Sequence, residues 1–214
     1  MVSKKLGWIK RRLGDFGNKL FYRKSEKMNL FIVTSIVQSV IEEYRNIYEG
    51  DLPKALKELA KGSETGAGEI VSDLIENPIM FGISLKFLLS KHLPDVGLQI
   101  WWTLLSILGN DAKKIFGKPK FIPATEAEDG ITKIVIALKQ CMMCSTKLNI
   151  APEDLGDQDY FHVITSIAEA AVQHMQDYVE NDYKIKCKET KCFLRGDDQG
   201  ELTLFFYPKD ESSS

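Results

Sequence analysis

Four cysteines are the residues of this chain whose type and spacing could hold a metal ion. Cys141 and Cys144 are separated by two residues, a spacing that brings two thiolates to one tetrahedral ion such as zinc. Cys187 and Cys192 could supply a second pair, but residues five apart point to opposite faces of an unbroken strand. Both could therefore ligate only if a bulge intervened. The sequence favours the alternative, in which the thiols are small, buried, apolar side chains.

The other patterns that could support catalysis or nucleotide binding are weak. The histidines at positions 92, 162 and 174 have no serine or cysteine partner in a recognisable motif, and the Cys-x-x-Cys pair lacks the βαβ context of a redox enzyme. The glycines at positions 62, 66 and 68 follow no predicted strand and precede no Gly-Lys-Ser/Thr, which argues against a phosphate-binding loop. They predict close contact between a helix and a sheet, or a break between two helices. We expect a non-enzymatic protein without a cofactor.

The composition is that of one globular domain. The chain has 214 residues, of which 44% are hydrophobic and 27% are charged, enough for a full core. Few cysteines and no recognisable cleavable signal predict a reduced, cytoplasmic protein. The most apolar runs, 30–40 and 96–108, are interrupted by polar residues and fall short of the roughly 20 residues of a membrane span, so they predict buried helices.

The basic charge is concentrated in residues 1–27. This segment contains nine lysines and arginines but only two acids, Asp15 and Glu26, which gives a net charge of +7. Because the whole chain carries −2, the rest carries −9. Apolar residues recur on one helical stripe with basic residues beside it, as in helices that lie in a membrane interface. The predicted membrane-contact residues are Leu6, Trp8, Ile9, Lys10, Arg11, Arg12, Leu13 and Phe16.

The same segment allows two other interpretations. The apolar stripe could pack on the domain itself or on a second subunit. Basic segments can also bind RNA, but no nucleic-acid motif accompanies this one, so we expect no nucleic-acid partner. Glycines at positions 7, 14 and 17 lower helix propensity by about 1 kcal/mol each relative to alanine.

Helical periodicity dominates the first half of the chain. Helices are predicted over 28–48, from Asp51 as N-cap onward past position 70, and over 83–91 and 96–116. Trp101 and Trp102 point in different directions on a helix, so at least one of them should face another element, a ligand cavity or a dimer partner. Phe121-Ile122 is a candidate strand, Asp129-Gly130 predicts a hairpin turn, and 131–138 predicts a strand rich in isoleucine and valine. Residues 145–159 read as an exposed loop.

The last fifty residues give the firmest prediction. Apolar residues over 160–179 recur at three- and four-residue steps, which indicates a helix. The period then falls to two over 183–187, and the strand continues to 194; a turn at 195–200 separates it from a second strand at 201–207. The prediction is an α+β domain over 28–208, with helices on one side of a small antiparallel sheet. The basic N-terminal helix precedes it, and 209–214 form a disordered tail.

The stretch KETKCFLRGDDQGELTLFF, preceded by a helix with Ser166 and Ala170 four residues apart, resembles the end of vinyl-reductase-type small-ligand-binding domains. These domains share a fold with the small subunits of the TRAPP vesicle-tethering complex. The stretch ALKELAKGSETGAGEIVSDLIE resembles the early helix of the same group. In metal-binding members the resemblance implies ligands at Glu189 and Cys192, but Gly200 stands where another cysteine is expected, and Phe161-His162 stand near the helical one.

The resemblance implies two functions. The first is a TRAPP-like adaptor or tethering-complex subunit that dimerises through its helical face, meets anionic membrane with its N-terminal helix and, once assembled, engages a partner such as a small GTPase. One class of TRAPP subunits carries a lipid-modified cysteine after the early helix, and positions 77–87 here contain none, so that feature is not transferred. The alternative is a sensor holding a small apolar ligand between helices and sheet, in a pocket lined by Trp101, Trp102, Phe161 and Met175.

Overall fold

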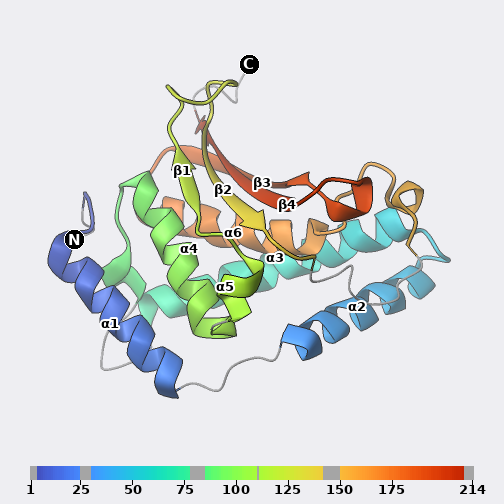
Figure 1. Cartoon of the computed structure of the whole chain (residues 1–214), viewed down its shortest axis with the longest axis horizontal. Helices are drawn as coiled ribbons and strands as arrows, with labels where there is room; N and C mark the ends of the chain where they lie inside the picture. The colour runs from blue at the N-terminus through green and yellow to red at the C-terminus, as the bar shows by residue number, and fades with distance from the viewer. Residues whose placement is uncertain (1–3, 25–29, 78–84, 110, 142–149, 210–214) are drawn as a thin grey trace.

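A computed structural model of the protein describes residues 4–24, 30–77, 85–109, 111–141 and 150–209. Helices lie on one side of a four-stranded antiparallel sheet whose strand order is β1-β2-β4-β3 (Figure 1). This is the α+β class that the sequence predicts. The predicted tail from 210 onward lies outside the described residues, and so does Cys144.

The C-terminal unit has the predicted order of helix, strand, turn and strand. Helix α6 (His162–Tyr178) is followed by β3 (Tyr183–Lys191), a 3-10 turn η3 (Phe193–Arg195) and β4 (Gly200–Pro208). β3 and β4 pair antiparallel, with Ile185 opposite Phe206. Gly196 ends the turn at φ +92°, a left-handed conformation that favours glycine. The strand prediction is confirmed, except that β3 ends at 191 after a register shift between Glu189 and Lys191.

The other half of the sheet is a hairpin of β1 (Lys120–Ile122) and β2 (Thr132–Leu138). The predicted turn between them is confirmed, because Gly130 has a φ of +68° and β1 pairs with β2 up to Ile122 opposite Lys133. Alternate residues of the sheet point towards the helices and form the core, as the two-residue period of a strand requires. The inward-facing, buried side chains are Ile134, Ile136, Leu138, Ile185, Cys187, Leu202, Leu204 and Phe206.

Side chains from α6 and the segment before it cover the outer edge of β3. Three amides on this edge have no strand partner and donate to these side chains. Alternate amides of β3 match side chains one helical turn apart, because one helical turn and two strand residues advance by similar lengths. Such cover removes an edge that could otherwise pair with another chain. The bonds join Ile185 N–H to Gln173 Oε1 at 2.8 Å, Cys187 N–H to Glu169 Oε2 at 2.9 Å, and Glu189 N–H to Asp159 Oδ2 at 3.2 Å.

Helices α2 (Leu30–Ile47) and α3 (Leu52–Glu76) pack together, and α3 lies along α6. Asp51 caps α3 as predicted, accepting from Lys54 N–H at 3.0 Å. The prediction for the glycines of α3 is wrong. The helix runs through them unbroken, and a Cβ at Gly62 or Gly66 would meet nothing within 4 Å. Burial of an apolar stripe against α6 outweighs their low helix propensity.

The predicted single helix over 96–116 is two helices. Helix α4 (Leu93–Leu108) ends at Gly109, which caps it with a φ of +61°, and the short α5 (Asp111–Ile115) follows. The cap explains the break, because a residue with positive φ cannot continue a right-handed helix. Within the predicted helix 83–91, Leu85–Leu88 form a 3-10 turn, η1, and 89–91 are not helical, so the prediction of an α-helix is wrong there; residues 78–84 lie outside the description.

Part of the predicted exposed loop at 145–159 is packed against the core. Its described portion contains a 3-10 turn, η2 (Pro152–Leu155), and Leu155 is fully buried in the core. The residues before it, Pro152 to Asp154, are exposed, and their polar composition is what predicts a loop. Leu155, together with Ile150, therefore anchors this connection in the core.

Candidate functional site

The N-terminal helix α1 (Trp8–Lys24) lies against α4 and η1 (Figure 1). Its anchor is Asp95, in the first turn of α4, whose side chain is fully buried. One carboxylate oxygen of Asp95 accepts from Leu6 N–H at 2.9 Å and from the Ser90 hydroxyl at 2.7 Å. The other oxygen accepts from Arg11 Nη2 at 2.5 Å. Leu6 itself is 2% exposed, so it belongs to the core and not to a surface.

The charge of Asp95 is stabilised where it is buried. Burial alone would raise the pKa of this carboxyl, but the hydrogen bonds from Leu6, Ser90 and Arg11 together outweigh it and hold the pKa below its usual value. His92, the residue that precedes α4, places its Nδ1 3.5 Å from the same carboxylate. Asp95 therefore holds α1 to the domain as an anion.

A second contact holds the middle of α1. The Trp102 indole of α4 donates from Nε1 to Asp15 Oδ1 at 2.9 Å, and Gly14 lies against its ring. A Cβ at Gly14 would overlap that ring, so only glycine fits there. The prediction that one of the two tryptophans faces another element is confirmed by Trp102. Close packing on the domain thus explains Gly14, one of the glycines in the predicted membrane helix.

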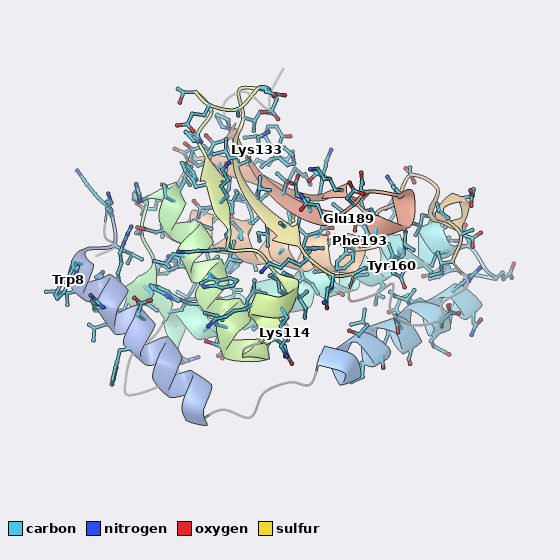
Figure 2. The ribbon with its side chains drawn as sticks, in the orientation of Figure 1. Trp8, Lys114, Lys133, Tyr160, Glu189 and Phe193 are labelled. Carbon is cyan, nitrogen blue, oxygen red and sulfur yellow. The ribbon has the colours of Figure 1, made fainter. Side chains whose placement is uncertain are left out.

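The opposite face of α1 is exposed and apolar. Trp8 is 72% exposed, Ile9 66%, Phe16 63% and Leu13 41%, and Figure 2 shows Trp8 on the outer side of α1, away from the sheet. Arg12 lies over the Trp8 ring at 5.6 Å. We call Trp8, Ile9, Arg12, Leu13 and Phe16 the outer face of α1.

The predicted membrane-contact residues are therefore divided between two faces. Leu6 and Arg11 face the domain through Asp95, and Lys10 is turned towards the Phe87 ring of η1, 4.8 Å from its Nζ. Packing of the segment on the domain, the second interpretation of the sequence, is what the inner face does. The outer face of α1 remains available for the first interpretation, contact with a membrane.

Helix α2 carries a second exposed apolar surface. Ile36 is 57% exposed, Val40 37% and Ile47 62%, and their spacing of four and seven residues places them on one side of the helix. Isolated exposed apolar residues are ordinary, but a row on one helical face is typical of an interaction surface. We call these three residues the α2 face.

Of the candidate metal ligands, the structure brings Glu189 and Cys192 together, with a hydrogen bond between their side chains. Cys141 is disulfide-bonded, so the prediction of a reduced, apolar thiol is wrong for this residue. Cys187 is a free thiol buried in the core beside Leu204. Gly200, where a further cysteine would stand in metal-binding relatives, is packed tightly: a Cβ there would lie 3.0 Å from Leu138. Within the described ranges, no three His, Cys, Asp or Glu side chains are placed to hold a metal ion.

The environment of these groups disfavours their charged forms. Burial, opposed by the hydrogen bond from Cys192 and reinforced by the nearby Asp159, raises the pKa of Glu189 to about 7. Burial and the Glu189 carboxyl raise the pKa of Cys192 to about 11, and burial with Glu169 and Asp159 raises that of Cys187 to about 12. Both thiols stay protonated at neutral pH, which fits packing and not nucleophilic chemistry.

The four residues predicted to line a ligand pocket lie in two parts of the molecule. Phe161 and Met175 are buried in the main core, and Trp101 packs against that core. Trp102 instead belongs to the contact with α1. Phe161, Met175 and Trp101 therefore belong to the core, and Trp102 helps to hold α1.

This arrangement of helices on one face of a four-stranded antiparallel sheet defines the fold class. It is shared with a solved structure of trafficking protein particle complex subunit 3 from Naegleria fowleri, covalently bound to palmitic acid in that protein. The match has a TM-score of 0.57 at 16% identity and covers 86% of this chain and 99% of that one. No family model and no curated protein matches the sequence. The chain has the TRAPP-like fold; the vinyl-reductase part of the resemblance has no such support.

Proposed function

We propose that the protein is a non-enzymatic, TRAPP-like subunit of a tethering complex that contacts anionic membrane through the outer face of α1. The observation that carries the proposal is the way α1 is held: its inner face is fixed by Asp95 and Trp102, while Trp8, Ile9 and Phe16 remain exposed. The fold likeness supports the tethering role at the level of architecture. Assembly with other subunits, and a small GTPase engaged by the assembled complex, are part of the same proposal.

The chemistry of α1 suits a membrane interface. Amphipathic helices bind there by burying a row of large apolar side chains while lysines and arginines meet anionic headgroups. The first 27 residues carry a net charge of +7, whereas the rest of the chain carries −9. No helix in the described part of the chain could cross a membrane, so the contact proposed is with the surface.

Replacing Trp8 and Phe16 with serine in the full-length protein should lower binding to vesicles of 70% phosphatidylcholine and 30% phosphatidylserine at least tenfold. Both side chains are exposed, so the change removes apolar area that would enter the interface without uncovering core. Co-sedimentation at constant salt measures the effect. Deleting α1 is a poorer test, because it would expose Asp95 and Trp102.

The matched control is Ile70→Ser on α3, another isoleucine that is 63% exposed. It should bind vesicles as the unchanged protein does. Equal sedimentation of all three proteins, or binding that does not depend on phosphatidylserine, would remove α1 from the membrane role while leaving the fold likeness intact.

We further propose that the α2 face is the surface through which the subunit dimerises. Ile36→Glu combined with Ile47→Glu should convert a dimer to a monomer, because two carboxylates would enter an apolar contact that cannot pair them. Light scattering after size exclusion measures the mass. Ile70→Glu is the control and should leave the mass unchanged; a monomeric unchanged protein would place the contact with a different subunit.

A further inference from the structure

The outer side of the sheet, opposite the helices, carries a regular row of lysines. Lys184, Lys186 and Lys188 occupy alternate positions of β3 and are all exposed. Alternate residues of a strand recur at about 7 Å on one face. The edge of β3 itself is covered by side chains of α6, so the row is presented by the face of the sheet and not by an open edge.

Two aromatic rings lie beside this row. Tyr207 is opposite Lys184 and Phe205 is opposite Lys186 in the β3–β4 register. The two rings stack at a centroid distance of 6.2 Å, and Lys133 of β2, opposite Phe205 on its other side, places its Nζ 5.5 Å from the Phe205 ring. Figure 2 labels Lys133 on β2. The face therefore alternates cationic and aromatic strips from one strand to the next.

The cations of this face are unevenly neutralised. Lys186 pairs with Glu169 at 2.6 Å and Lys133 with Asp129 at 2.8 Å. Among the residues that the structure describes, no carboxylate forms an ion pair with Lys184 or Lys188. Glu169 lies on α6 and Asp129 in the β1–β2 turn, and Glu201, on the same face of β4, pairs with Lys191 at 3.8 Å. The unpaired positive charge is therefore confined to a narrow strip around Lys184 and Lys188.

We propose that this face binds an acidic, extended segment of a partner protein, running along β3 and β4. An extended chain places alternate side chains on one side at the same interval as the lysine row, so its carboxylates can meet Lys184 and Lys188 while its apolar side chains contact Phe205 and Tyr207. The proposal does not depend on the membrane role of α1, which uses a different surface.

The same features favour a protein segment over other polyanions. Phe205 and Tyr207 stack on each other and carry Lys133, which leaves less ring surface for a nucleobase to stack on. The acidic border and a charge of −9 outside residues 1–27 would repel a bilayer or a long nucleic acid, which extend beyond the strip. A single segment lying within the strip avoids that repulsion.

The test uses a fluorescent peptide of alternating glutamate and leucine with the full-length protein. Fluorescence anisotropy should show binding that weakens with salt, and the double variant Lys184→Glu, Lys188→Glu should bind at least tenfold more weakly. The control variant Lys57→Glu, Lys61→Glu makes the same charge change at two exposed positions of α3 and should stay within twofold of the unchanged protein. Bound peptide should also protect Lys184 and Lys188, but not Lys57 and Lys61, from acetylation.

Three outcomes would overturn the proposal. The peptide fails to bind, or both double variants weaken binding equally, which would mean that net charge and not this face decides. Alternatively, a single-stranded oligonucleotide or a phosphatidylserine vesicle binds more tightly than the peptide and loses affinity only in the Lys184, Lys188 variant. That third result would assign the face to nucleic acid or to membrane.

Discussion

Asp95→Ala is expected to detach α1 from the domain and to lower the free energy of unfolding by about 2–4 kcal/mol. The substitution removes the acceptor of three hydrogen bonds, from Leu6 N–H, Arg11 and Ser90, and leaves the Leu6 and Ser90 donors buried without this partner. Undocked, α1 would expose Trp102. The measurements are urea unfolding, hydrogen exchange of the α1 amides, which should become at least tenfold faster, and a red shift with stronger iodide quenching of tryptophan fluorescence.

Gly14→Ala tests the same contact from its packing side. The new methyl group would overlap the Trp102 ring, so we expect faster exchange in α1 with Asp95 intact. Gly7→Ala is its control, since a Cβ there meets nothing within 4 Å. Asp111→Ala, which breaks an exposed pair with Lys114, is the control for charge and should leave both α1 exchange and urea unfolding nearly unchanged. If Asp95→Ala left α1 exchange unchanged, the anchoring role of this carboxylate would be refuted.

The local periodicities of the C-terminal unit were sufficient to predict it. The apolar spacing of α6 and the alternation in β3 and β4 each report which face is buried, and the turn residues around Gly196 mark the reversal between the strands. The prediction was wrong where the effect of individual glycines depends on their packing and backbone conformation. Gly109 divides an apolar run into α4 and α5, and the open glycines of α3 neither break it nor make close contact.

The anchoring of α1 could not be predicted from the sequence. Asp95 reads as an ordinary acid in the first turn of a helix, and its partner Leu6 lies 89 positions away. The pattern of 1–27 places Leu6, Ile9 and Phe16 on one apolar stripe, but the helix begins at Trp8, so Leu6 precedes it and need not follow that stripe. Only the fold shows that Leu6 and Arg11 face inward while Trp8 and Phe16 face outward. Likewise, the lysine row of β3 becomes a surface only when β4 supplies the rings beside it.

Glu189→Gln is expected to make the protein more stable than the unchanged chain at pH 8 by about 1–2 kcal/mol, and equally stable near pH 4.5. Burial raises the pKa of Glu189 from 4.5 to about 7 in the folded state, so folding favours the protonated carboxyl. The unchanged protein should therefore be most stable below pH 4.5 as far as this group is concerned, lose stability as the pH rises towards 7, and change little above that. The pKa difference of about 2.5 corresponds to an upper bound of about 3 kcal/mol, which partial exposure to water reduces.

The glutamine variant keeps the size of the side chain and an acceptor oxygen for the Phe161 N–H that bonds Glu189, so it removes the charge without opening a cavity. Urea unfolding between pH 4.5 and 8 should show a shallower pH dependence for Glu189→Gln than for the unchanged chain. Glu64→Gln, at an exposed position of α3, should follow the unchanged chain within about 0.5 kcal/mol. Parallel pH profiles for the unchanged protein and Glu189→Gln would mean that Glu189 is ionised without penalty. The junction of β3 and α6 would then contain a stable carboxylate, which would reopen it as a place for a cation.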